Sequence, residues 1–347
     1  MSSSTETQSA ASFSLKLGSN EQTQANNLGI STLVFEDHVD MVAMVTVRMT
    51  KIGESGDLPC AIGDEVTLKL GTSDTEVFQG EIVSMKPGFS AKGGTSLTVR
   101  ALDKVHRLGR GRKTRVFEDM KDSDVVSDVG GEAGLNVSAD ATDETLPYIL
   151  QRNESDIAFL KRLAARNNFI LRISDGDLTF SKPQFEGTGY DIQMGGNLRD
   201  FTIEYNTTNL VQNVVVRGWD VEAKEEIVGE ATTSDVDQIG NGTLGVETAS
   251  AFGDSTAYVT DVPVSSQSAA DAVAKAEMNR IARQFARGTA TIAGNETVRA
   301  GTMVTFSGIK AAVNGTCFVI GTRHVISTAT GYEVQLSFCS TSEGEAG

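Results

Sequence analysis

The sequence has few of the residues that carry redox, metal and nucleophilic chemistry. Among its 347 residues there are 3 cysteines and 3 histidines. Cys60, Cys317 and Cys339 lie far apart, without the paired spacing of a zinc site or of a disulfide framework. We expect each cysteine to be a small buried residue in a reducing compartment, and we expect neither a bound metal nor a cofactor.

Long apolar runs are also absent. No stretch is long enough to cross a membrane, and residues 1–8 contain neither the basic nor the apolar region of a secretory signal. The protein is therefore expected to be made in the cytoplasm without a signal peptide and to have no stable membrane insertion. By composition, the residues up to about Ala11 are expected to form a flexible tail.

Basic residues are outnumbered by acidic ones. The formal net charge is -16 and the pI is about 4.7, which argues against a surface dominated by specific nucleic-acid binding. Two explanations of the acidity stay open: solubility or a salty habitat, and an acidic wall along a conduit through which cargo passes.

One dense basic run, KVHRLGRGRKTR, extends from Lys104 to Arg115. It contains no aromatic residue that could stack on a base, so a role in nucleic-acid binding is the less favoured reading. We expect the run to be a linker that docks on an acidic surface of this chain or of a partner. The residues of this possible interface are Lys104, Arg107, Arg110, Arg112, Lys113 and Arg115.

No catalytic motif is present. Nucleophilic catalysis needs a histidine placed as a base, and His38, His106 and His324 lie in no recognisable motif. The glycine-rich stretches lack the order of a phosphate-binding loop. The 46 acidic residues make carboxylate pairs unavoidable, so such pairs indicate nothing about a glycosidase. The protein is therefore expected not to be an enzyme.

The sequence does have a strong strand pattern. Prolines number 5 and glycines 35, which is typical of many turns between ordered strands. Alternating apolar residues predict several strands between Phe13 and Ala101, with Val45, Val47 and Met49 on one face. Glycine-containing turns at 71–74 and 92–94 separate them. This pattern favours a small antiparallel barrel or sandwich.

The middle of the chain combines helices with strands. A short helix is expected from Asp122 or Ser123 to Gly130-Gly131. A second is expected after Pro147, with Asn153 as its N-cap and a left-handed stop at Asn167 or Asn168. Its apolar stripe is Ile157, Leu160, Leu163 and Ala164. A hairpin follows, with strands around Phe169–Ser174 and Leu178–Phe180, and we expect the stripe to pack against Leu171, Ile173 and Leu178.

The segment QRNESDIAFLKRLAARNN, residues 151–168, resembles the signature of the phage late control protein D family. That family includes the baseplate hubs of contractile phage tails and of extracellular contractile injection systems, and the hub part of type VI secretion VgrG proteins. Its pattern is an aromatic residue, a glutamine, Glu-Ser-Asp, Phe-Leu and an arginine. The positions that fill it are Tyr148, Gln151, Glu154, Ser155, Asp156, Phe159, Leu160 and Arg162.

The strand-rich ends of the chain resemble each other in four ordered blocks. Residues 40–48 align with 209–217, residues 63–67 with 301–305, residues 80–84 with 315–319, and residues 97–99 with 334–336. Four blocks in the same order favour a duplicated barrel.

The resemblance implies an α+β, mainly β fold with two related antiparallel barrels and an α+β domain between them. The expected domains are a first barrel at residues 1–112, an α+β domain at 113–197 and a second barrel at 198–347. The second would carry an insertion at about 221–263. Within the second barrel the spacing of apolar residues itself predicts a helix at about 268–287, which begins at Ser268 and ends at Gly288.

Three functions follow as alternatives. The resemblance implies a structural baseplate hub, a homotrimer that joins a sixfold tail tube to a threefold spike within a phage tail or an injection-system particle. Its partners would be the tail tube protein, other baseplate proteins and a spike on a separate polypeptide, because the chain ends soon after Phe338. A barrel-based receptor- or carbohydrate-binding tail module and a tail-associated peptidoglycan hydrolase are the other two.

Overall fold

The computed structural model describes residues 12–23, 29–50, 58–71, 75–91, 94–174, 176–187, 189–221 and 223–344. The expected tail up to Ala11 lies outside these ranges, and so do parts of the two expected turns near residues 72 and 92. None of the helices in the described ranges is long and apolar enough to span a membrane.

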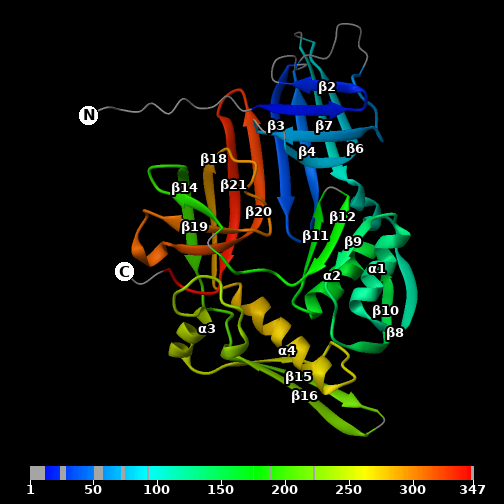
Figure 1. Ribbon diagram of the computed structural model, residues 1–347, viewed down its shortest axis with the longest axis vertical. Coiled ribbons are helices and arrows are strands. Elements are labelled where there is room, and N and C mark those ends of the chain that lie inside the picture. Colours follow the sequence, from blue (N-terminus) through cyan, green and yellow to red (C-terminus); the bar gives the residue numbers. More distant parts are fainter. Residues whose placement is uncertain are drawn as a thin grey trace.

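One sheet of 13 strands takes in both ends of the chain (Figure 1). Its path runs β14-β18-β21-β20-β3-β4-β7-β6-β5-β1-β2, and β19 and β13 continue from β20. The N-terminal strands are β1 (Phe13–Leu17), β2 (Asn20–Thr23), β3 (Ile30–His38), β4 (Met41–Met49), β5 (Glu65–Leu70), β6 (Thr75–Phe89) and β7 (Thr95–Asp103). The C-terminal strands are β13 (Tyr190–Gln193), β14 (Leu198–Tyr205), β18 (Ala286–Ala293), β19 (Met303–Ser307), β20 (Gly315–Ser327) and β21 (Gly331–Ser340).

The mainly β architecture expected from the sequence is confirmed. Strand pairing in the large sheet is antiparallel except between β13 and β19. The predicted inward face of β4 is buried, since Val45, Val47 and Met49 are each 1% exposed. Within the described ranges no closed barrel is found. The two halves of the sheet instead join edge to edge where β20 pairs with β3.

The order of strands in the first half recurs in the second. The path β1-β5-β6-β7-β4-β3 corresponds to β13-β19-β20-β21-β18-β14, in the same order along the chain. Backbone bonds repeat as well: Gly63 N donates to Ile82 O at 2.9 Å, and Gly301 N donates to Val319 O at 2.8 Å. The equivalence is incomplete at one edge, because β1 is antiparallel to β5 whereas β13 is parallel to β19.

The structure corrects two of the aligned blocks. Residues 209–217 are no counterpart of 40–48, because β15 (Asn213–Asp220) lies outside the large sheet and the strand in the place of β4 is β18. The bulges that follow Ile82 and Val319 are equivalent, and they make Cys317 rather than Gly315 the counterpart of Gly80. The other two blocks keep their register.

The expected α+β segment contains two small sheets and two helices, packed around one apolar cluster. β8 (Lys113–Lys121) pairs with β10 (Thr145–Glu154), and β12 (Asp177–Ser181) pairs with β11 (Ile170–Ser174) and with β9 (Asn136–Ala139). Leu160 and Leu163 share the cluster with Leu171 and Leu178, as predicted, and Ile157 is partly buried against it. The side chain of Ile173 lies outside the described residues.

The helix boundaries differ from prediction at five ends. α1 (Asp122–Glu132) has Lys121 as its N-cap and continues through Gly131. α2 (Asp156–Arg166) begins after Ser155, whose hydroxyl accepts from Ala158 N, so the expected N-cap at Asn153 is wrong. α4 (Gln267–Ala282) begins after Ser266 rather than at Ser268, and it ends well before Gly288, which belongs to β18. The left-handed stop is confirmed at Asn168, with φ +55°.

The stretch after β14 forms a further unit with its own core. β15 pairs with β16 (Glu225–Thr232) and β17 (Thr256–Val259), α3 (Gly245–Thr248) lies near them, and α4 packs on this small sheet. Gly229 allows the close approach of α4, since a Cβ there would lie 2.2 Å from the Ala270 carbonyl carbon. This unit therefore contains β15 and α4 in addition to the expected insertion at 221–263.

Candidate functional site

The signature residues form a buried polar network at the start of α2. The fully buried Gln151 donates from Nε2 to Asp156 Oδ1 at 2.9 Å and to Glu154 O at 3.0 Å. Arg115 on β8 donates to Gln151 Oε1 at 2.7 Å and to Asp156 Oδ1 at 2.9 Å. Lys113 adds a bond to Asp156 Oδ2 at 2.8 Å. These bonds satisfy the buried groups at the bulge near the end of β10, just before α2.

The other signature residues support the same turn. Arg162 donates to Leu150 O at 2.6 Å and to Glu154 Oε1 at 2.8 Å, and its guanidinium lies 5.2 Å from the centre of the Phe159 ring. Phe159 and Leu160 are fully buried, whereas the side chain of Tyr148 is 55% exposed. Arg162 thus connects α2 to the end of β10, whereas Phe159 and Leu160 belong to the apolar cluster of this segment.

Asp156 is the titratable centre of this network. Burial by itself would raise the pKa of its carboxyl group. Hydrogen bonds from Lys113 and Gln151, together with the charges of Lys113 and Arg115, outweigh burial and hold that pKa below its usual value. The carboxylate is thus fixed in its charged form, which suits a structural anchor and gives no acid for catalysis.

The basic run meets acidic groups of its own chain. Its first part is a 3₁₀ helix, Lys104–Gly109, and its last residues begin β8. The ion pairs are Lys104 with Glu65, Arg107 with Glu81, Lys113 with Asp156, and Arg115 with Glu132 and Asp156. Arg112 donates to Asn153 O at 3.2 Å. Whether Arg110 and the rest of the run also contact another chain stays a prediction.

A buried ion pair lies where the two halves of the large sheet meet, at the pairing of β20 with β3. Asp37 on β3 is 2% exposed, and its Oδ2 accepts from Arg299 Nε at 2.7 Å. The Arg299 guanidinium also lies 4.8 Å from the centre of the Phe35 ring. On β20, His324 is fully buried and its Nδ1 lies 3.0 Å from the hydroxyl of Tyr332. Arg299 therefore connects the second half with β3, and so does His324, whose ring centre lies 5.4 Å from that of Phe35.

The joint between β3 and β20 also carries a groove. A groove of about 410 Å³ lies over β3, β18, β20 and β21. Its lining includes Glu36, His38, Thr289, Thr291, Arg323 and Gln335. Arg323 Nε lies 3.6 Å from Glu36 Oε1. Cationic and anionic side chains thus share this face.

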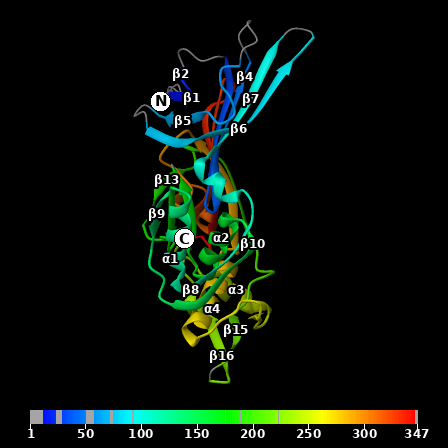
Figure 2. The same cartoon turned by 90° about the vertical axis from the view of Figure 1, so that its right-hand side faces the viewer.

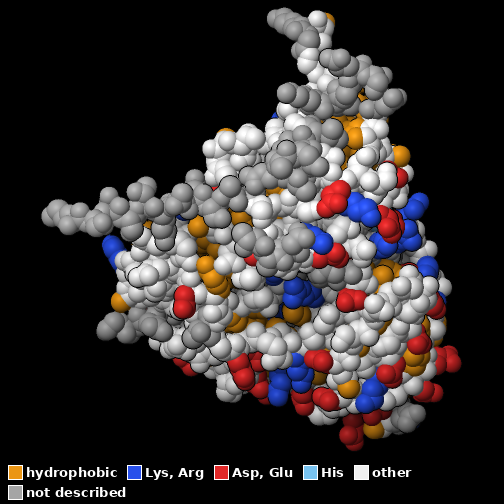
Figure 3. Space-filling model, turned by 45° about the horizontal axis from the view of Figure 1, so that its top comes forward, with side chains coloured by type: hydrophobic (Ala, Val, Ile, Leu, Met, Phe, Trp, Pro, Cys, Tyr) orange, Lys and Arg blue, Asp and Glu red, His pale blue; other side chains and the backbone are white. Residues whose placement is uncertain are grey.

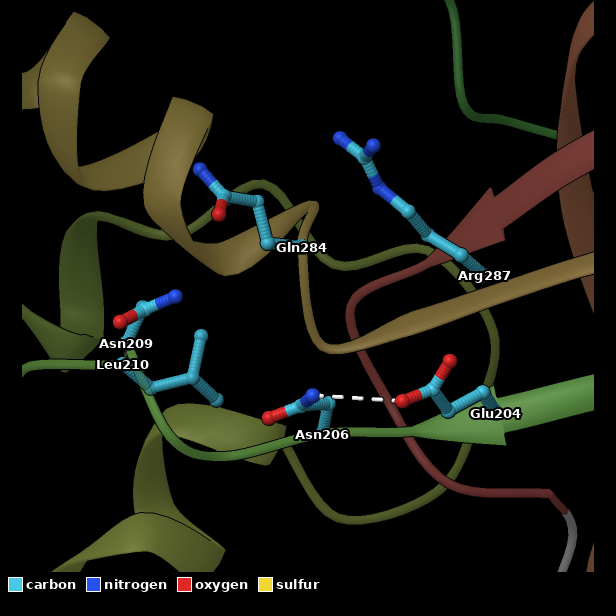
Figure 4. A pocket seen from close by; sticks show the side chains of 6 residues that line it. All are labelled: Glu204, Asn206, Asn209, Leu210, Gln284 and Arg287. Atoms are coloured by element: carbon cyan, nitrogen blue, oxygen red, sulfur yellow. Dashed lines mark hydrogen bonds between the residues drawn. The ribbon is translucent and has the colours of Figure 1, made fainter.

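A smaller hollow of about 150 Å³ lies at the end of β14 (Figure 4). Asn206 Nδ2 donates to Glu204 Oε1 at 3.3 Å, and the side chains of Gln284 and Arg287 lie across from this pair. Asn209 and Leu210 complete the lining. The hollow contains no nucleophile next to a base, so its geometry suits recognition of polar groups rather than covalent chemistry.

The three cysteines and His324 are withdrawn from solvent. Cys60, Cys317 and Cys339 are free and buried, and burial raises the pKa of each thiol, to about 11 for Cys60 and Cys339. His324 is held neutral, because burial and then the charge of Arg299 lower its pKa to about 3. In the described part of the chain no group of three or more His, Cys, Asp or Glu side chains could hold a metal ion.

The face seen in Figure 3 bears on the acidity of the chain. Acidic and basic side chains lie interspersed along its lower and right-hand edges. On the described part of this face, no continuous acidic wall is seen.

Comparison with known proteins gives one family match. A family model described as the Alg8 N-terminal domain matches residues 51–328, which is most of the chain. This name differs from late control protein D, the family expected from the sequence. No curated protein matches the chain.

Solved structures of phage tail proteins share the fold. The 43 kDa tail protein of prophage MuSo2 from Shewanella oneidensis superposes with a TM-score of 0.74 at 14% identity, covering 95% of this chain and 98% of that one. A tail protein from Neisseria meningitidis gives 0.72 at 15%, covering 95% and 97%. An Escherichia coli component of the type VI secretion system, described as similar to the T4 bacteriophage tail proteins gp27 and gp5, gives 0.62 at 11%, covering 96% and 79%. At such low identities the likeness establishes the fold alone.

Proposed function

We propose that this chain, which belongs to the Alg8 N-terminal domain family, is a structural baseplate hub of a contractile tail or injection system. Its fold, shared from end to end with phage tail proteins, is the observation that carries the proposal. The late control protein D resemblance of residues 148–162 supports it. The particle would be a phage tail or an injection system.

The proposed working form is a homotrimeric adaptor. A sixfold tube and a threefold spike need a joint with six similar surfaces on one side and three on the other. The strand order repeated in the two halves of the large sheet supports six related barrel-like units in three chains. In this account residues 1–112 and 198–347 supply those units, and residues 113–197 form the domain between them.

The parts present once per chain are proposed to face the spike and other baseplate proteins. They are the α+β segment and the small sheet with α4. The small-sheet unit exposes Trp219, Phe252 and Tyr258, each more than half accessible in a chain with 1 Trp and 5 Tyr. Exposed aromatic side chains of this kind are frequent anchors in protein interfaces.

The same exposed aromatics favour the second candidate, a receptor- or carbohydrate-binding module. The two functions differ in what Trp219→Ala removes. If the protein is a hub, the Trp219→Ala variant no longer copurifies with the spike, and neither the variant nor the unmodified chain binds glycans. A receptor-binding variant loses binding to a glycan array and still copurifies with the spike.

The test of the hub function is a deletion of the gene in the producing strain. We expect particles without an attached spike, or no tails at all, and restoration by the gene supplied in trans. Intact spike-bearing tails in the deletion strain contradict the proposal. We also propose that the chain is not a hydrolase, and clearing of a peptidoglycan gel by the purified protein would contradict that.

A further inference from the structure

β20 is paired along both edges, and through them it joins the two halves. One edge faces β21 from Phe318 to Ser327. The other edge faces β19 from Gly315 to Phe318 and then β3 from Gly321 to Ser327. Along this edge the strand thus pairs first with β19 of its own half and then, beyond a bulge, with β3 of the other half.

β6 is built in the same way, but its far edge lacks a partner strand. It pairs with β7 from Gly80 to Phe89 and with β5 from Thr75 to Glu81. Beyond Ile82, no strand in the described ranges pairs with the second edge of residues 84–89. Figure 2 shows the ends of β6 and β7 projecting beyond the rest as a two-stranded ribbon. An unpaired edge of this kind is a template for another strand.

β14 has the complementary edge. It pairs with β18 on one side, and in the described part of the chain its other side is not paired with a strand. Its counterpart β3 uses that same side to pair with β20. The pairing of Phe201 with Ala290 matches that of Leu33 with Val47, which places Glu204 at the position of Glu36.

We infer that residues 84–89 of one copy of this chain pair antiparallel with β14 of a neighbouring copy, in the register that β20 and β3 use within the chain. The inference rests on the proposed trimer and names the surfaces that build it. In this register Lys86 lies opposite Glu204 and Gly88 lies opposite Thr202.

Charge supports this register. Within the chain, Arg323 on β20 lies opposite Glu36 on β3, with 3.6 Å between Nε and Oε1. The equivalent residues of the intermolecular ladder are Lys86 and Glu204, which keep the same signs on the same strands. Both are exposed in the single chain, and opposite charges directly across a strand pair are favourable.

Phe89 supplies the apolar part of the argument. Its counterpart on β20 is Ile326, which is 8% exposed and belongs to the core of the other half. Phe89 is 70% exposed. In the neighbouring copy it would lie opposite Phe201, whose ring is 4.9 Å from Phe306 and 5.6 Å from Phe338. A second copy therefore offers this aromatic ring the kind of site that Ile326 occupies within the chain.

Pro87 fits an edge strand. Proline has no N–H for a ladder and is confined in sheets to edges and bulges. Its position on residues 84–89 limits indiscriminate pairing with other strands. In the proposed register Pro87 lies opposite Ile203 and has no N–H to donate to the partner strand. The ion pair and Phe89 therefore set the register.

Oxidative crosslinking tests the inference. Gly88→Cys and Thr202→Cys in one chain place two thiols directly across the proposed ladder, at a spacing that a disulfide spans. We expect covalent multimers up to the trimer on non-reducing gels. The control, Gly88→Cys with Arg217→Cys on the small sheet, should stay monomeric on such gels, because the native cysteines are buried.

The outcomes separate this inference from the proposed function. A trimer in native mass spectrometry without the crosslink overturns the inference and leaves the hub proposal standing. The crosslink in open chains that never reach a trimer supports the strand pairing and overturns the trimer. Absence of both the crosslink and the trimer overturns both.

A charge swap gives a second readout. Lys86→Glu and Glu204→Lys alone should each weaken assembly roughly tenfold, because like charges then face each other. The double variant should recover assembly, and Lys224→Glu at an exposed turn of the small sheet should behave as the unmodified chain. Equal losses in the single and double variants overturn the register.

Discussion

At the scale of single residues, the polar groups that matter most to this protein are the ones it buries. Asp37 and Arg299 form a pair with side chains 1% and 13% exposed. Such pairs add little over apolar contacts, but removing one partner leaves an uncompensated charge. The pair therefore fixes how the halves of the sheet join.

Arg299→Met should lower the free energy of unfolding by about 3 to 5 kcal/mol, because it leaves the Asp37 carboxylate buried without its cation. Urea unfolding followed by circular dichroism measures this. The matched control is Arg323→Met, which removes an ion pair from the exposed face and should cost at most about 1 kcal/mol. Equal losses of unfolding free energy in the two variants contradict a special role of the buried Asp37–Arg299 pair.

His324 predicts a dependence on pH. Its folded pKa is about 3, against 6.5 for the free side chain, so between these values the unfolded chain binds a proton that the folded chain does not. The contribution to stability is therefore fully present well above pH 6.5 and is lost as the pH drops. From pH 7 to pH 5 the loss from this group is about 2 kcal/mol.

The check is urea unfolding of the unmodified chain and of His324→Gln at pH 7 and pH 5. The variant is expected to lose less stability on acidification, whatever its stability at pH 7. An identical acid loss in both proteins excludes His324 as the source.

Leu160 tests the core of the α+β segment. It is fully buried, so Leu160→Asp places an unpaired charge among apolar side chains, at a cost of several kcal/mol. We expect insoluble protein or protein unable to assemble. Ala158→Asp is the control, because it lies on the exposed side of the first turn of α2, where negative charge is favourable. A soluble, assembly-competent Leu160→Asp variant contradicts the packing.

At the scale of elements, the start of α2 shows which of two candidate residues, Asn153 or Ser155, caps the helix. Asn153 lies at a bulge with φ +46°, a left-handed conformation that asparagine tolerates well. Ser155 caps the helix. Ser155→Ala should therefore cost about 1 kcal/mol, whereas Asn153→Gly should be nearly neutral, since glycine adopts positive φ without strain. Thermal unfolding of the two variants distinguishes them, and the reverse order contradicts the cap assignment.

Most strands could be predicted from alternation, because one face of each is buried and the other is not. β4 and β7 are examples, since their apolar residues recur at every second position and face the core. The helices α1, α2 and α4 were found by the same logic of spacing. Their ends were less accurate, since several Ser, Asp and Asn residues compete for each cap and tertiary contacts decide.

The sheet order was only partly accessible from the sequence. Two of the aligned blocks have the register seen in the structure, because the same turn and the same alternation of buried residues occur in both halves of the sheet. β15 was misplaced because a buried parallel or antiparallel strand shows the same apolar run, whichever sheet it joins. Lys86, Phe89 and Glu204 have no local signal, and their match to Arg323, Ile326 and Glu36 becomes visible only through strand pairing.

At the scale of the whole molecule, the strand pairing that we propose between chains already occurs once within each chain. β20 and β3 pair across the two halves, and the ends of β6 and β14 present the same surfaces outward. A contact that uses different surfaces on its two sides generates a ring when its rotation closes. Three copies would place six related units around the axis.

Native mass spectrometry of the chain copurified with its spike tests this account most directly. We expect three copies of this chain and three of the spike polypeptide in one complex. Six copies of this chain, or a single copy in an intact spike complex, contradicts the account, because the repeated strand order would then not supply the change from sixfold to threefold symmetry.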